Sequence, residues 1–117
     1  MSLFSQFFSN PISQLGPEQA RARLEQDPKP LLLDVRQPEE YRSGHIPGAR
    51  LVPLGELPRQ ISQLPKEREI ICVCESGSRS SLAVQQLVSA GLQANNLRGG
   101  MTGWVMAGLP VKKGGES

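Results

Sequence analysis

The fold of this chain is decided by the stretch Glu69-Ile70-Ile71-Cys72-Val73-Cys74-Glu75-Ser76-Gly77-Ser78-Arg79-Ser80. Its first half is almost entirely apolar, rich in β-branched residues and without polar alternation, which is typical of a central parallel strand covered on both faces. Its second half is small and polar, and it leads into an apolar-periodic segment that predicts a helix. Since open α/β sheets bind ligands beyond the carboxyl ends of their strands, Cys74 is expected at the ligand-binding edge.

Strands and helices are expected to alternate on both sides of this stretch. Short apolar runs predict further strands, and capping and breaker residues predict helices. The strands are expected over 31–35, 51–52 and 95–98, and the helices over 17–26, 38–43, 55–64 and around Trp104. Such alternation implies right-handed crossovers and an α/β fold, with a parallel sheet flanked by helices on both faces.

Length and composition exclude several classes of protein. With 117 residues the chain is expected to form one compact domain, and an aromatic content of 4% predicts an aliphatic core. The 13 basic and 11 acidic residues are interspersed, which argues against nucleic-acid binding, since that function favours a basic stripe with aromatic residues. No apolar run reaches about 18 residues, so no membrane span is expected. The N-terminus does not read as a secretory signal, so a cytoplasmic location is expected.

The sequence is expected to divide into an N-terminal arm over 1–11, a folded domain over 12–111 and a flexible tail over 112–117. The arm holds all three phenylalanines, Phe4, Phe7 and Phe8, at spacings that place them on one side of a short helix. We expect the arm to pack on its own domain. A dimer contact, a docking surface or a weak membrane-surface anchor remain as alternatives.

Cys74 has three features that favour a thiolate. It precedes the N-terminus of the expected helix, whose dipole stabilises an anion. Ser76, Gly77 and Ser78 allow backbone N–H groups to turn inward as an anion-binding nest, and these serines and Ser80 supply hydroxyl donors. Arg79 adds a permanent positive charge. The structural alternative is a buried cysteine beside an ordinary helix-capping loop.

The remaining polar and sulfur-bearing residues are expected to have structural roles. Cys72 lies within the strand and reads as core, and two cysteines with one histidine do not supply the four ligands of a structural zinc site. His45 is expected to hold a Pro-Gly turn, and Trp104 to lie in the core.

Two arginines are candidates for the rim of the pocket. Asp34 and Arg36 are expected to form a local ion pair or a turn hydrogen bond, with a contribution to the field of the pocket as the alternative. Arg98 follows the last expected strand and is a second candidate for the rim. Gly99 and Gly100 beside it are expected to allow close packing or a turn.

Three ordered segments resemble the single-domain rhodaneses, a family of sulfurtransferases. The first runs from Leu33-Asp34-Val35-Arg36 through Pro38-Glu39-Glu40-Tyr41 to Gly44-His45-Ile46-Pro47-Gly48-Ala49. The second is the Cys74–Ser80 loop. The third runs from Leu97-Arg98-Gly99-Gly100-Met101 to Gly108-Leu109-Pro110. The resemblance covers residues 12–111 and implies a rhodanese-like domain with a mainly parallel, five-stranded sheet.

The resemblance also implies an activity without a cofactor or metal. Cys74 would take sulfane sulfur from thiosulfate or a persulfide and pass it to cyanide, a thiol or a partner protein. Glu75, Ser76, Gly77, Ser78 and Arg79 would bind the substrate or the persulfide. The spacing C-x4-R between Cys74 and Arg79 matches the sulfurtransferases, whereas related phosphatases have C-x5-R. Phosphatase activity is therefore disfavoured.

Glu75 departs from the thiosulfate-using members, which often carry a basic residue after the cysteine. A carboxylate there repels a dianion, so we expect slow thiosulfate turnover, faster use of persulfides, and a gain for thiosulfate in a Glu75→Lys variant. The main alternative is a weakly active or non-catalytic module that binds a protein partner. Arsenate or thiol-redox chemistry at Cys74 is a third reading, weakened by the absence of a resolving cysteine on a loop.

Overall fold

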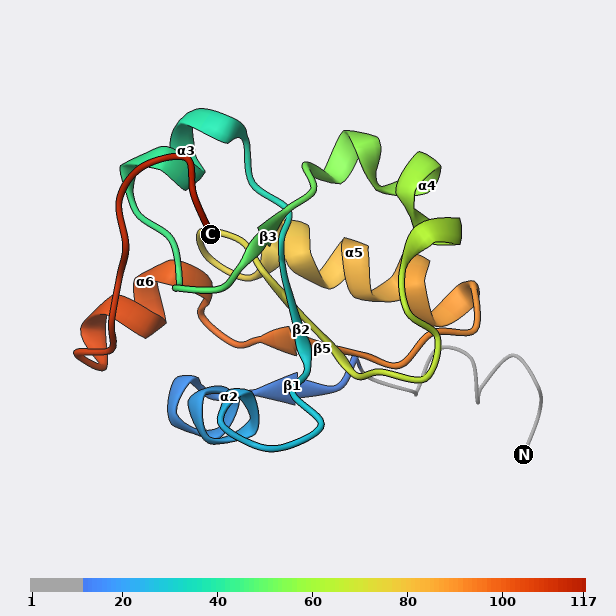
Figure 1. Ribbon diagram of the computed structural model, residues 1–117, viewed down its shortest axis with the longest axis horizontal. Coiled ribbons are helices and arrows are strands. Elements are labelled where there is room, and N and C mark those ends of the chain that lie inside the picture. Colours follow the sequence, from blue (N-terminus) through green and yellow to red (C-terminus); the bar gives the residue numbers. More distant parts are fainter. Residues whose placement is uncertain (1–11) are drawn as a thin grey trace.

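The computed structural model describes residues 12–117, which form one sheet with helices on both faces (Figure 1). The arm over 1–11, with its three phenylalanines, lies outside the described residues. The strands are β1 (Gln14–Leu15), β2 (Leu31–Asp34), β3 (Arg50–Leu51), β4 (Ile70–Val73) and β5 (Ala94–Leu97). The helices are α2 (Pro17–Leu24), α3 (Pro38–Ser43), α4 (Leu57–Gln60), α5 (Ser78–Ser89) and α6 (Gly100–Met106), with 3-10 turns η1 (Leu54–Glu56) and η2 (Ile61–Gln63).

The strands follow the order β1-β5-β4-β2-β3, and every strand pair is parallel. Strand β4 is central, with Cys72 in register with Leu33 of β2 on one side and with Asn96 of β5 on the other. The α/β fold with a five-stranded parallel sheet is thereby confirmed. Because all carboxyl ends point the same way, the segments after β2, β4 and β5 meet at one edge.

Two apolar clusters cover the two faces of the sheet. Helices α4 and α5 pack on the face that holds Cys72 and Cys74, where Leu57, Ala83 and Leu87 are fully buried. Helices α2, α3 and α6 pack on the opposite face through Ala20, Tyr41, Met101 and Trp104. All four residues of β4 are buried, which explains why its sequence is apolar without alternation.

Two local features differ from the sequence expectation. Strand β1 was not predicted, because two residues are too few for any hydrophobic period to appear. The helix expected over 55–64 is divided into η1, α4 and η2. Gly55 disfavours regular helix, and Pro58 has no backbone N–H to donate, so it is tolerated only in the first turn of α4.

The last residues follow a defined path along the turn at His45. His45 and Lys112 form an antiparallel bridge, with N–H to carbonyl distances of 2.9 and 2.8 Å. The N–H of Gly114 donates to the carbonyl of Arg42 at 2.9 Å. The expected tail over 112–117 is thus attached to the domain at several points, and its mobility stays a prediction.

Candidate active site

The loop between β4 and α5 places the sulfur of Cys74 beneath a turn of backbone N–H groups. Gly77, with φ of 107°, is the residue that reverses the chain there, and a side chain would be strained at this angle. Its N–H donates to Cys74 Sγ at 3.1 Å. The backbone N–H groups that reach the sulfur are those of Ser76, Gly77 and Ser80, whereas the predicted nest comprised Ser76, Gly77 and Ser78.

The surroundings of Cys74 favour its ionised form. Burial by itself raises the pKa of the Cys74 thiol, but hydrogen bonds from the Ser80 hydroxyl and from the backbone N–H groups of Ser80, Gly77 and Ser76 outweigh it, and the net pKa is lowered. The Ser80 hydroxyl lies 3.3 Å from the sulfur. The hydrogen bonds at this buried site thus favour the thiolate form of Cys74.

The other two serines of the loop point away from the sulfur. Ser76 and Ser78 are exposed, and their hydroxyl oxygens lie 3.4 Å from each other. Of the three hydroxyls expected to face bound sulfur, the structure places that of Ser80 against Cys74. The backbone of Ser76 contributes, but its side chain does not.

Ser80 is in turn supported by Asn96 on the neighbouring strand β5. Both side chains are buried, and the Ser80 hydroxyl also donates to Asn96 Oδ1. Asn96 Nδ2 donates to Ser81 Oγ at 3.1 Å and to the Gly77 carbonyl at 3.3 Å. Sequence reasoning missed Asn96, although an asparagine inside a buried strand is itself a signal, because its polar groups must find partners.

Arg79 points to Glu40 on α3. Its two terminal nitrogens donate to the two carboxylate oxygens of Glu40 at 2.8 and 2.9 Å. This pairing raises the pKa of Arg79 and lowers the pKa of Glu40 to about 2. Arg79 was expected to supply positive charge to the sulfur, whereas its hydrogen bonds here tie the start of α5 to α3.

The Glu40–Arg79 pair predicts a pH-dependent stability. Glu40 has its ordinary pKa near 4.5 and a folded pKa of about 2, so the pair stabilises the fold above pH 4.5 and stops doing so as the pH falls towards 2. A Glu40→Gln variant should lose about 1 kcal/mol of unfolding free energy at neutral pH, because both partners are about one-third exposed.

Urea unfolding at several pH values measures this effect. The gap between wild type and Glu40→Gln should shrink steadily below pH 4.5. Glu39→Gln is the control, because the carboxylate of Glu39 lies next to Glu40 in the sequence but does not pair with Arg79. A gap that stays constant down to pH 2 would contradict the assignment.

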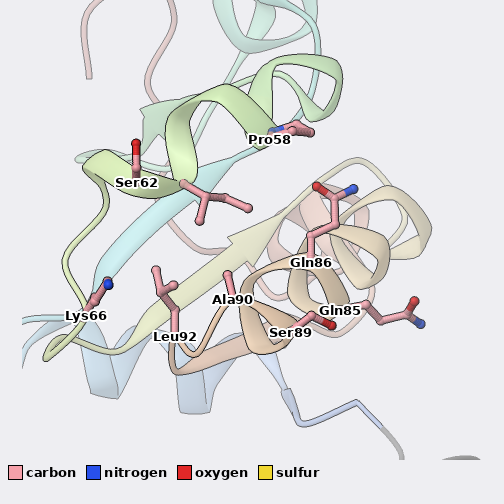
Figure 2. A pocket seen from close by; sticks show the side chains of 9 residues that line it. Pro58, Ser62, Lys66, Gln85, Gln86, Ser89, Ala90 and Leu92 are labelled. Atoms are coloured by element: carbon pink, nitrogen blue, oxygen red, sulfur yellow. The ribbon is translucent and has the colours of Figure 1, made fainter.

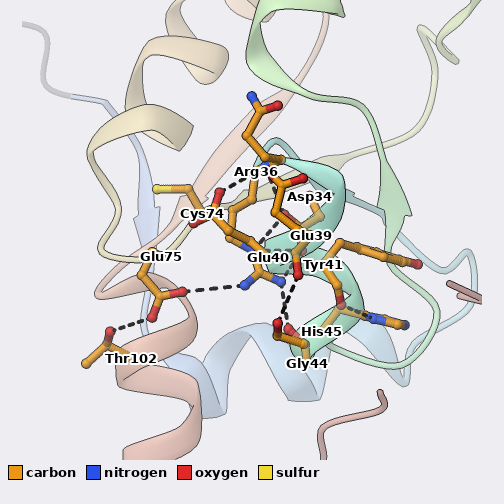
Figure 3. Close-up of polar contacts among 12 residues, drawn as sticks. Asp34, Arg36, Glu39, Glu40, Tyr41, Gly44, His45, Cys74, Glu75 and Thr102 are labelled. Atoms are coloured by element: carbon orange, nitrogen blue, oxygen red, sulfur yellow. Dashed lines mark hydrogen bonds and ion pairs between the residues drawn. The ribbon is translucent and has the colours of Figure 1, made fainter. Parts of the chain in front are cut away.

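Arg36 and Glu75 meet at the mouth of the loop (Figure 3). Arg36 is 3% exposed and binds the carboxylate of Asp34 at 2.8 Å, as the sequence predicted, and it donates to the Gly44 carbonyl at 2.7 Å. Glu75 Oε1 lies 3.4 Å from Arg36, and its other oxygen accepts from the Thr102 hydroxyl at 3.2 Å. The Glu75 carboxylate therefore links the segment after β2 to helix α6.

A groove of about 540 Å³ adjoins the loop at this point. Its polar end is formed by Arg36, Glu40, Glu75 and Thr102. Its apolar side is formed by Met101, Val105, Met106 and Val111. Glu75, the residue after Cys74, thus forms part of the wall and faces the groove.

Arg98, the second candidate for the rim, lies elsewhere. Its side chain is exposed and reaches the start of α2, where a Cβ added to Gly16 would stand 3.0 Å from its Nη2 atom. Arg98 does not line the groove beside Glu75. Of the two arginines, the structure brings Arg36 to the loop and leaves Arg98 on another surface.

Comparison with protein families identifies this arrangement. A family model for the rhodanese-like domain matches residues 16–107. The chain belongs to the rhodanese-like family. It is 36% identical over 101 residues to a sulfurtransferase of Allochromatium vinosum, which covers 86% of this chain and 94% of that protein.

Solved structures of rhodanese-like domains have the same fold. A rhodanese-related protein of Thermoplasma volcanium superposes with a TM-score of 0.80 at 27% identity, covering 86% of this chain and 97% of that one. A thiosulfate sulfurtransferase of Pseudomonas aeruginosa superposes with a TM-score of 0.81 at 29% identity, covering 97% of this chain. This rhodanese-like domain corresponds to 22% of that longer enzyme.

Other residues of this rhodanese-like domain have the structural roles predicted for them. Burial raises the pKa of Cys72 to about 12, so its thiol is inert core. The buried ring of His45 stacks on Tyr41, with Nδ1 2.8 Å from the Tyr41 carbonyl and Nε2 2.7 Å from that of Glu116. Trp104 is buried and donates to the Pro110 carbonyl at 2.7 Å.

A second hollow lies at the far end of α5, away from the loop (Figure 2). It has a volume of about 720 Å³, and its lining includes Pro58, Ile61, Gln86 and Leu92 but neither cysteine. Within residues 12–117, no group of three His, Cys, Asp or Glu side chains is placed to hold a metal ion. Over the same residues, every helix is too short or too polar to cross a bilayer.

Proposed function

We propose that this protein is a sulfurtransferase that carries sulfane sulfur as a persulfide on Cys74. The observation that supports it best is the sulfur of Cys74 under hydrogen-bond donors from Gly77 and Ser80, with its pKa lowered despite burial. A thiolate is the nucleophile that sulfane sulfur chemistry needs. The loop from Cys74 to Arg79 also has the short C-x4-R length of the sulfurtransferases that the chain resembles.

The cycle has two displacement steps. The Cys74 thiolate attacks the outer sulfur of a persulfide R–S–SH, the S–S bond breaks, and R–S⁻ leaves. An acceptor nucleophile, a thiolate or cyanide, then attacks the outer sulfur of the Cys74 persulfide, and the electron pair of that S–S bond returns to Cys74. Both steps conserve charge, and neither needs a metal or a redox cofactor. The N–H groups of Ser76, Gly77 and Ser80 stabilise the charge on Cys74 before the first step and after the second.

The charge at the entrance favours persulfides as sulfur donors over thiosulfate. Arg36 is neutralised by Asp34, and Arg79 by Glu40. Glu75 pairs with Arg36 at 3.4 Å, but Arg36 is shared with the closer carboxylate of Asp34. Two arginines thus face three carboxylates, so this cluster beside the Cys74 loop carries a net charge of about −1, which repels the thiosulfate dianion.

Glu75→Gln should raise kcat/KM for thiosulfate, which carries two negative charges, more than the value for an alkyl persulfide, which carries at most one. The side chain is 52% exposed, so the expected gain is below about 1 kcal/mol, or roughly threefold to fivefold. Steady-state assays at low and high salt measure it, and salt should reduce the gain. An equal change for both donors would show that charge is not the cause.

Intact-mass spectrometry tests the proposed function directly. The wild-type protein is incubated with a low-molecular-weight persulfide or with thiosulfate, and each sample is then treated with cyanide. A gain of one sulfur atom that cyanide removes is the expected result, with faster loading from the persulfide. No adduct from either donor would refute the proposal.

A partner-binding module is the second candidate, and one observation favours it. Val105, Met106 and Val111 line the groove beside Glu75, yet they are 55%, 83% and 41% exposed. Exposed apolar side chains beside the Cys74 loop are better suited to contact the surface of a partner protein than to bind a small anion. In this reading the groove would hold a protein sulfur donor or acceptor, or a partner that exchanges no sulfur. The mass experiment separates the last case from the others.

A further inference from the structure

The hydroxyl group of Ser80 lies within hydrogen-bond distance of two acceptors, but it has only one proton to donate. It lies 3.3 Å from Cys74 Sγ and is also in hydrogen-bond contact with Asn96 Oδ1. Ser80 is 0% exposed and Asn96 is 2% exposed, so bulk water does not supply a second donor. The proton can satisfy one acceptor at a time, and the charge on Cys74 decides which.

The orientation of the Asn96 amide follows from its neighbours. The Gly77 carbonyl can only accept, so the amide group must present Nδ2 to it, at 3.3 Å. Ser81 donates its own hydroxyl proton to the same carbonyl at 2.7 Å, so its oxygen accepts from Asn96 Nδ2. Both contacts turn Asn96 Oδ1 towards Ser80. The orientation of Asn96 therefore makes its Oδ1 atom and Cys74 Sγ compete for the hydroxyl proton of Ser80.

We propose that the Ser80 proton alternates between Cys74 and Asn96 during the sulfur-transfer cycle, which makes Asn96 a positioning residue that acts through Ser80. The inference rests on the proposed function. When Cys74 is a thiolate, the hydroxyl donates to its sulfur. When that sulfur becomes the uncharged inner atom of a persulfide, it is a weak acceptor, and the hydroxyl rotates to Asn96 Oδ1.

The alternation has a chemical use in the second step of the cycle. As an acceptor attacks the outer sulfur, the S–S electron pair moves to Cys74, and the Ser80 hydroxyl needs only to rotate back to stabilise it. Meanwhile Asn96 keeps the buried hydroxyl satisfied in the persulfide state. No covalent bond of Ser80 or Asn96 breaks in either direction.

The proposal predicts opposite effects for two variants. Ser80→Ala removes a donor from the thiolate and should raise the pKa of Cys74 by about one unit, a tenfold loss of thiolate below that pKa. Asn96→Val removes the competing acceptor and should lower the pKa of Cys74. The Gly77 carbonyl remains held by the Ser81 hydroxyl at 2.7 Å, so the turn is not released. In the Ser80→Ala background, Asn96→Val should have no effect.

The thiolate absorbance in the ultraviolet, titrated against pH without any sulfur compound, measures these shifts. Cys74→Ser supplies the baseline, and Cys72 does not interfere because its pKa is about 12. Melting temperatures check folding, and Asn96→Ala replaces Asn96→Val if that variant does not fold. Two results would overturn the proposal: a raised pKa of Cys74 in the Asn96 variant, or an effect of that variant on the pKa of Cys74 when Ser80 is absent. Either result is expected if Asn96 has only a structural role.

The rate at which cyanide removes sulfur from the loaded protein is a second measurement. Ser80→Ala should slow sulfur transfer to cyanide about tenfold, in line with its pKa shift, whereas Asn96→Val should speed it, because the hydroxyl no longer has to leave Asn96 Oδ1. Slow release in Asn96→Val would count against the proposal. If no variant takes up sulfur, wild type included, the proposed function fails, and the thiolate titration still decides on the shared proton.

Discussion

Cys74→Ser is expected to abolish sulfur loading, with a fall of at least about a thousandfold in transfer rate. A serine hydroxyl stays protonated at neutral pH, so the donors of the loop have no anion to stabilise. The hydroxyl group also forms no persulfide. Intact mass after incubation with a persulfide donor should show no added sulfur atom.

Cys72→Ala is the matched control for this experiment. Cys72 lies two residues before Cys74 and is equally buried, but its pKa is raised to about 12, whereas that of Cys74 is lowered. Its removal leaves a small cavity and should cost about 1 kcal/mol of unfolding free energy without preventing loading. If Cys74→Ser gained a sulfur atom and Cys72→Ala did not, the reactive cysteine would be Cys72 and the proposal would be wrong.

Gly100→Ala is expected to be the most destabilising change near the loop, at about 3–5 kcal/mol of unfolding free energy. A Cβ at Gly100 would stand 2.4 Å from the carbonyl oxygen of Cys74 and 2.6 Å from that of Glu75. These are backbone atoms, so the loop itself would have to move. The N–H groups of Met101 and Thr102, which bind the same two carbonyls at 2.8 and 3.1 Å, would lose their partners.

Gly108→Ala separates this clash from simple backbone strain. Gly100 and Gly108 both have positive φ, 56° and 74°, but a Cβ at Gly108 would meet nothing within 4 Å. Gly108→Ala should therefore cost only about 1–2 kcal/mol, the cost of the left-handed conformation. Urea denaturation measures both variants. Equal losses would mean that the contact between α6 and the Cys74 loop does not constrain the protein.

The sequence was sufficient for the parts of the site that are local in the chain. The apolar run over β4, the small residues after it and the helix beyond them predict the position of Cys74 and the turn of N–H groups around it. Asp34 and Arg36 are two residues apart, and their ion pair was predicted for the same reason. The core positions of Cys72 and Trp104 followed from their apolar surroundings.

The contacts between distant segments could not be predicted in this way. Arg79 and Glu40 are 39 residues apart, as are Arg36 and Glu75, and they meet only because β2 and β4 are neighbours in the sheet. The position of Asn96 depends likewise on β5 lying beside β4. Residue types and spacing do not determine strand order. The positive charge of Arg79 could therefore be predicted from the sequence, but its pairing with Glu40 could not.

The loop at Cys74 draws its supports from both ends of the domain, and this has a consequence for the newly made chain. Glu40 comes from the first half of the sequence, whereas Asn96 and the N–H groups of Met101 and Thr102 come from its last strand and helix. A nascent chain on the ribosome therefore exposes Cys74 well before those late supports have been synthesised. The hydrogen bond from Ser80 to Asn96, and those from Met101 and Thr102 to the carbonyls of Cys74 and Glu75, form only after that synthesis. Complete folding of the loop around Cys74 is thereby coupled to completion of β5 and α6.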